Sequence, residues 1–198
     1  MKLTQDVWGF VVALAAVING LGIVRLIAAL GDYVKKRASL DVTHYWPYGL
    51  TATFQLLLHV LLWWSVLGLK AVGQINFLSY LYLLVGPTLL FLATTILLPD
   101  VAGTSIDLKA DYRECRKSYY TILSIFWVWT VFLWPAFGYP FPPTVKFLLL
   151  WLPVSLTLRF SENDKVHAAL AVANILIFAA FVALYAMKLG EVGRLMTQ

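Results

Sequence analysis

The sequence is poor in charged residues and in cysteine, and both shortages narrow the class of protein. Only 13% of its 198 residues are Asp, Glu, Lys or Arg, whereas 61% are hydrophobic. A soluble domain carries about twice that share of charge. The single cysteine, Cys115, excludes an intrachain disulfide, a CxxC redox pair and a thiolate zinc cluster. The composition therefore indicates an integral membrane protein.

The chain also lacks the common catalytic motifs, and its apolar runs lack carboxylates. It contains no HExxH, GxSxG or P-loop sequence. Every Asp and Glu lies near the end of an apolar run or in a loop, so no acid is placed for proton coupling or for acid–base work within the membrane. We therefore favour a protein without enzymatic activity and keep an intramembrane enzyme as a third hypothesis.

Six apolar segments are long enough, or nearly so, to cross a bilayer, for which about 20 residues are needed. They cover residues 7–31, 47–69, 76–98, 119–138, 145–160 and 166–188. The first run is too long for a cleavable signal peptide, so we interpret it as a spanning helix. The polar segment 107–118 is expected to be a solvated helical extension of the fourth span. The pattern predicts an all-α bundle of six transmembrane helices, a single domain over residues 1–198 with no soluble domain.

Lys and Arg are distributed unequally between the two sides of this arrangement. Loops one, three and five hold nine of them, and the other side holds five. The positive-inside rule then places both termini outside the cytoplasm, in a multi-pass protein of the cell inner (plasma) membrane. Basic flanks and contact with lipid head groups account for the net charge of +5, so we expect no nucleic acid partner.

Arg25 is the most informative single residue, because it lies inside the first apolar segment with no carboxylate closer than Asp32. A cation at the centre of a membrane helix costs roughly 2.5–3.5 kcal/mol on insertion scales. Such a residue indicates a functional site or a specific partner. A structural role, with the side chain reaching to the interface or toward Asp32, is the competing interpretation.

Depth along the spans places four more polar residues near Arg25. At about 1.5 Å per helical residue, Arg25, Gln55 and Asn174 lie ~12–14 Å from the cytoplasmic ends of spans one, two and six, and Asn19 and His59 lie ~20 Å from them. We expect these five residues to form a ligand-binding site. Interhelical hydrogen bonds, worth about 0.6–2 kcal/mol, are the alternative role for Asn19, Gln55 and Asn174.

The histidines do not predict a cofactor. His59 and His167 differ by about 17 Å in depth, so they cannot ligate one haem from both sides. His44 and His167 share a level, but without an acid or thiol partner they make a weak metal site. We predict neither a cofactor nor a metal.

Two functions remain open. The leading hypothesis is a channel or transporter for a small, possibly anionic, solute that Arg25 attracts. The alternative is a non-catalytic membrane subunit or sensor, in which Arg25 pairs with a partner or locks the bundle. Small residues spaced by three or four in the first segment (Gly9, Ala13, Ala16 and Gly20) allow close helix packing, so we expect a homo-oligomer or a membrane complex.

Overall fold

The computed structural model describes residues 2–36, 41–68, 76–99 and 105–187, and nearly all of these are helical. The elements in chain order are α1 (Lys2–Lys36), β1 (Asp41–Thr43), α2 (Trp46–Gly68), α3 (Phe77–Leu97), β2 (Ser105–Asp107), α4 (Leu108–Val131), α5 (Leu133–Ala136), α6 (Val145–Phe160), α7 (Asp164–Phe181) and the π-helical η2 (Val182–Ala186). The expectation of an all-α fold is confirmed within these ranges.

Polar side chains cap the first turns of α3, α4 and α7. The Asn76 side chain accepts a hydrogen bond from the backbone N–H of Ser79 at the start of α3. Asp107 caps α4 and Asn163 caps α7 in the same way. These side chains satisfy backbone donors that have no partner within the helix.

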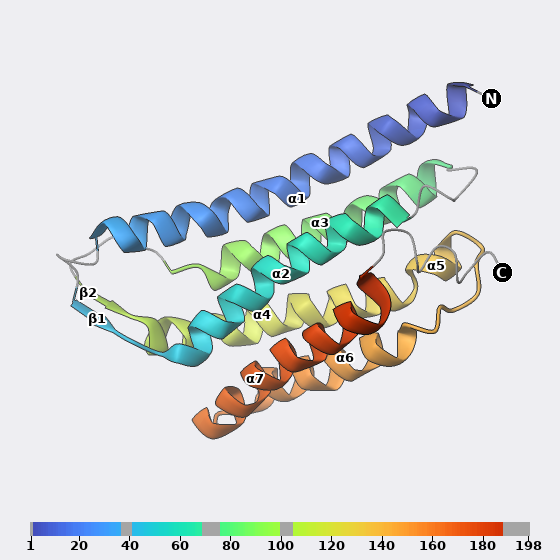
Figure 1. Cartoon of the computed structure of the whole chain (residues 1–198). Helices are drawn as coiled ribbons and strands as arrows, with labels where there is room; N and C mark the ends of the chain where they lie inside the picture. The colour runs from blue at the N-terminus through green and yellow to red at the C-terminus, as the bar shows by residue number, and fades with distance from the viewer. Residues whose placement is uncertain (1, 37–40, 69–75, 100–104, 188–198) are drawn as a thin grey trace.

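The helices pack as an elongated bundle with α1 on its outside (Figure 1). α1 lies against α3 and α2, α4 packs on α3 and α6, and α7 packs on α2 and α6. The short strands β1 and β2 pair in parallel at one end of the bundle, with Val42 opposite Ile106. This pairing joins the connection after α1 to the connection before α4.

Four helical stretches among the described residues are long and apolar enough to cross a membrane: Val12–Lys36, Trp46–Val66, Phe77–Leu97 and Asp164–Ala186. The expected spans 119–138 and 145–160 correspond to parts of α4, α5 and α6, which are not among these four. α4 begins at Leu108 and is charged in its first half. α6 has 16 residues, which corresponds to roughly 24 Å.

Aromatic side chains fill the interior between α2, α4 and α6. The rings of Trp127 and Trp151 stack with centroids 4.7 Å apart and an interplanar angle of 5°, and Trp127 Nε1 donates to Ser155 Oγ at 3.0 Å. Gly86 of α3 faces the Trp129 ring so closely that a Cβ would overlap it. These aromatic side chains are therefore closely packed, as is usual in a protein interior.

Candidate functional site

Five polar side chains meet inside the bundle, and we call them the polar core cluster: Asn19, Gln55, His59, Thr94 and Tyr119. They come from α1, α2, α3 and α4, and all are buried. Asn19 Oδ1 lies 2.7 Å from His59 Nδ1, and Thr94 Oγ1 lies 2.8 Å from His59 Nε2. The imidazole is therefore held from both sides.

The amide of Gln55 connects the rest of the cluster. Its Nε2 donates to Thr94 Oγ1 at 3.1 Å and to the carbonyl of Leu90 at 3.0 Å. Its Oε1 accepts from the Tyr119 hydroxyl at 3.0 Å. Each side chain of the cluster thus has a partner, as buried polar groups in a low dielectric require.

The hydrogen bonds also define the form of the imidazole. Asn19 Nδ2 donates to the backbone carbonyl of His59 at 3.0 Å, so Asn19 Oδ1 is the acceptor and His59 Nδ1 carries the proton. Thr94 accepts from Gln55 and can donate to His59 Nε2. This assignment gives a neutral His59, consistent with the lack of a carboxylate in the cluster.

The structure brings together three of the five residues that we expected to form a site, Asn19, Gln55 and His59. The other two lie elsewhere. Arg25 is exposed on α1, and with the described residues it makes neither a hydrogen bond nor an ion pair. Arg25 therefore does not join Gln55 and Asn174 in one buried layer, because it is exposed whereas both of these side chains are buried.

Asn174 is buried on α7, 5% exposed, but it is not part of the cluster. Its Oδ1 has no hydrogen-bond partner in the described part of the chain. It therefore differs from Asn19, whose Oδ1 and Nδ2 are both hydrogen-bonded.

Sequence reasoning missed Thr94 and Tyr119. Hydroxyls in apolar helices commonly bond to a carbonyl one turn earlier in their own helix. Thr51, Ser124 and Thr130 do so. Thr94 looks the same in sequence, and its role depends on facing His59 from another helix. The sequence feature that could have identified Tyr119 is its position at the boundary between the polar and apolar halves of α4.

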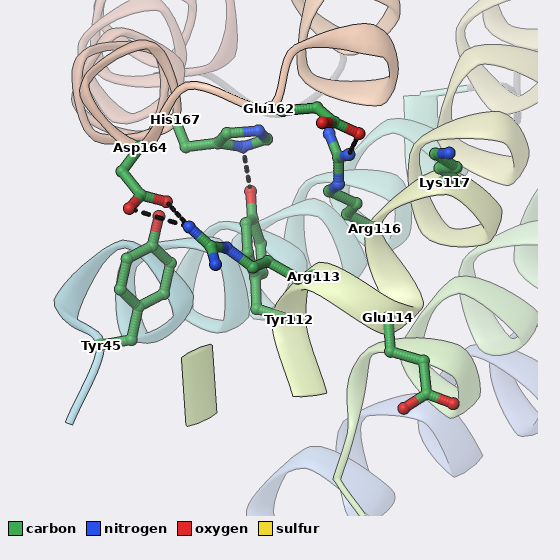
Figure 2. A pocket seen from close by; sticks show the side chains of 9 residues that line it. All are labelled: Tyr45, Tyr112, Arg113, Glu114, Arg116, Lys117, Glu162, Asp164 and His167. Atoms are coloured by element: carbon green, nitrogen blue, oxygen red, sulfur yellow. Dashed lines mark hydrogen bonds and ion pairs between the residues drawn. The ribbon is translucent and has the colours of Figure 1, made fainter. Parts of the chain in front are cut away.

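A second polar region forms a cleft of about 500 Å³ at one end of the bundle, and we call it the interfacial cleft. Five of the side chains come from α4, one precedes α2, and three belong to α7 and the connection before it. The lining residues are Tyr45, Tyr112, Arg113, Glu114, Arg116, Lys117, Glu162, Asp164 and His167 (Figure 2). None of them belongs to the polar core cluster.

Asp164 is the point where α4 and the start of α7 are joined. Lys109 Nζ lies 2.6 Å from Asp164 Oδ2, and Arg113 Nη2 donates to both carboxylate oxygens at 3.1 Å. The Tyr45 hydroxyl lies beside the same carboxylate (Figure 2). Burial and this nearby negative charge raise the pKa of Tyr45 above its ordinary value.

The wall of the cleft is a partly buried set of hydrogen bonds around the backbone carbonyl of Ser161. Arg116 Nη1 donates to this carbonyl, and His167 Nε2 donates to it at 3.0 Å. The other ring nitrogen of His167 lies 2.8 Å from the Tyr112 hydroxyl. Burial and the neighbouring Tyr120 raise the pKa of Tyr112 far above its ordinary value, so Tyr112 is a neutral hydrogen-bonding group.

Arg116 is nearly buried, with 6% of its side chain exposed, and it forms an ion pair of 3.0 Å with the exposed Glu162. Its position suits the carbonyl end of α6, because cations are stabilised near a helix C-terminus. Within the described ranges, no group of three or more His, Cys, Asp or Glu residues could hold a metal ion.

Comparison of the chain with protein family models, with curated proteins and with solved structures finds no match.

Proposed function

We propose that this chain is a non-catalytic subunit of a membrane assembly, and that the outward face of α1 binds a transmembrane helix of a different protein. Arg25 on that face pairs with a carboxylate of the partner. The observation that carries the proposal is the exposure of Arg25 on an apolar helix without a partner among the described residues.

The surroundings of Arg25 support a protein partner. Exposed apolar side chains lie beside it on the outer surface of α1, among them Leu21, one turn earlier, and the adjacent Val24. An unpaired cation at this depth is costly, and a partner's carboxylate would offset that cost.

The partner's chemistry follows from the distribution of acids in this chain. The six apolar segments contain no Asp or Glu. Arg25 lies about 9 Å along the helix axis from Asn19, which is in the middle of the bundle. A second copy of this chain has no carboxylate at that depth with which Arg25 could pair. The partner we propose is therefore a different chain with an Asp or Glu within a span.

The interior gives further support, because the polar side chains that would line a solute path are already hydrogen-bonded within the protein. The hydroxyls of Thr51, Thr53, Ser124 and Thr130 donate to their own helices. Ser155 accepts from Trp127. The polar core cluster thereby serves to hold α1 to α2, α3 and α4.

The proposal includes six crossings of the inner (plasma) membrane. α4 and α6 would supply the two crossings beyond the four apolar stretches, since both lie alongside them in the bundle (Figure 1). The excess of Lys and Arg in loops one, three and five supports placing both termini outside the cytoplasm.

Photo-crosslinking in native membranes tests the subunit function. A crosslinking amino acid at Val24, beside Arg25, should give one adduct of discrete mass, and the same group at exposed Leu149 of α6 serves as the control. Arg25→Lys should preserve the Val24 adduct, whereas Arg25→Leu should reduce it about tenfold, the loss of roughly 1.4 kcal/mol. Adducts to lipid alone, to a second copy alone, or an unchanged yield in Arg25→Leu would reject the proposal.

A second candidate function is the passage of a small anionic solute, which the convergence of Asn19, Gln55 and His59 in mid-bundle favours. This function requires the cluster to open a path between α1 and its neighbours. Liposome flux of small anions, compared between wild type, Arg25→Ala, Arg25→Lys and His59→Leu, tests it. Flux that falls in His59→Leu but is unchanged in both Arg25 variants would place the path at the cluster and remove Arg25 as the anchor.

A further inference from the structure

The interfacial cleft lies at the level where candidate spans begin. α2 starts at Trp46 and α7 at Asp164, and both are the first residues of stretches apolar enough to cross a membrane. Tyr45 and Asp164 line the cleft. Its opening is therefore at the depth of lipid head groups rather than far out in solvent.

The cations at the cleft come from one face of α4. Arg113, Arg116 and Lys117 line the cleft. Together with Lys109, one turn before Arg113, they are spaced by four, three and one residues, so successive turns of α4 direct positive charge to the same side. Figure 2 shows Arg113 beside Asp164 and Arg116 beside Glu162, with Lys117 further along the same helix. A volume of about 500 Å³ is in the range of small-molecule sites.

The ion pairs at the cleft leave N–H groups of Lys117 and Arg113 without a described partner. Asp164 is shared by Lys109 and Arg113. Lys117 is exposed, and its side chain makes no hydrogen bond or ion pair with any residue that the structure describes. Arg113 is 54% exposed and donates to Asp164 through Nη2 alone, so its remaining N–H groups are available. Glu114 points away from the other charged side chains (Figure 2).

We propose that the interfacial cleft binds a phosphate group, with Arg113 and Lys117 as its ligands. A guanidinium presents paired N–H donors that match phosphate oxygens, and an ammonium adds a point charge with three donors. Tyr112, Arg116 and His167 form a rigid wall because their polar atoms already have partners. The phosphate comes from an anionic lipid head group or from free phosphate, and both present the same chemistry to the cleft.

The experiment titrates the purified full-length chain in a neutral detergent with three probes and follows thermal unfolding. The probes are inorganic phosphate, dihexanoyl-phosphatidylglycerol and the zwitterionic dihexanoyl-phosphatidylcholine. A rise in the unfolding midpoint with phosphatidylglycerol alone identifies a lipid head group, and a rise with inorganic phosphate identifies free phosphate. Either result supports the site if phosphatidylcholine gives less.

Two matched variants decide whether the cleft is responsible. Lys117→Gln removes a cation that has no described partner, so folding should be retained while the Kd for the active probe rises about three- to tenfold. Lys165→Gln removes the same charge from the first turn of α7, outside the cleft lining, and should leave the Kd unchanged. No response to either phosphate probe, an equal response to phosphatidylcholine, or an equal effect of both variants would overturn the proposal.

Discussion

Asn19 of α1 and His59 of α2 are joined by two hydrogen bonds in the middle of the bundle. Asn19 Oδ1 lies 2.7 Å from His59 Nδ1, and Asn19 Nδ2 donates to the His59 carbonyl at 3.0 Å. One amide thus fixes both the side chain and the backbone of its partner. It also sets the rotation of α1 on the bundle, which determines that Arg25 faces outward.

Replacing Asn19 with leucine should destabilise the protein by about 1–3 kcal/mol, because His59 Nδ1 and a backbone carbonyl lose their partner while they stay buried. Unfolding of the variant in detergent, followed by circular dichroism against added denaturant, measures the change. A variant as stable as wild type would show that the pair contributes nothing to the fold.

Replacement of Asn174 with leucine should not destabilise the protein. Asn174 Oδ1 is buried without a described hydrogen-bond partner, so a leucine removes an unsatisfied acceptor and adds apolar contact. We expect Asn174→Leu to be neutral or stabilising and at least about 1 kcal/mol more stable than Asn19→Leu in the same assay. A cost equal to that of Asn19→Leu would indicate that Asn174 has a partner outside the described structure, such as a bound solute.

The sequence was sufficient to predict an all-α fold with long apolar helices and to place Asn19 and His59 at the same depth, since both follow from hydropathy and from distance along a helix. Depth does not fix the rotation of a helix about its axis. One residue turns the direction of a side chain by about 100°, so Arg25 points outward although its neighbour Leu26 is buried. Depth along the helix alone therefore does not distinguish Arg25 from the residues of the polar core cluster.

The interfacial cleft depends on contacts that no local pattern encodes. The prediction that segment 107–118 is helical is confirmed by α4. The same segment buries Tyr112 and Arg116, which a solvated extension would not do. Their partners His167 and Ser161 lie 55 and 45 residues later in the chain. Only the return of α6 and α7 alongside α4 brings these groups together.

Gly22 should not tolerate a side chain, because a Cβ at this position would overlap the His59 ring. The imidazole is held by Asn19 and Thr94 and cannot move without breaking those hydrogen bonds. We expect Gly22→Ala to cost about 1–3 kcal/mol of unfolding free energy.

Gly20, two positions away on α1, is the matched control. A Cβ there meets no atom within 4 Å, so Gly20→Ala should be neutral or add up to about 1 kcal/mol through helix propensity. Equal unfolding free energies for the two alanine variants would contradict the close contact between α1 and His59.

Cys115 should react slowly with thiol reagents in the folded protein. Burial, together with the nearby Asp111 carboxylate, raises the pKa of its thiol to about 12, whereas an unfolded cysteine has a pKa of about 8.5. Because the pKa is higher in the folded state, the thiol contributes its full share to the free energy of unfolding below about pH 8.5. This contribution is lost as the pH rises toward 12.

The rate of alkylation by iodoacetamide should therefore keep rising with pH beyond 9 in the folded chain, while the denatured chain reaches its plateau there. Mass spectrometry of samples quenched at intervals gives both rates, and a folded-state plateau near pH 9 would show that the thiol is open to solvent.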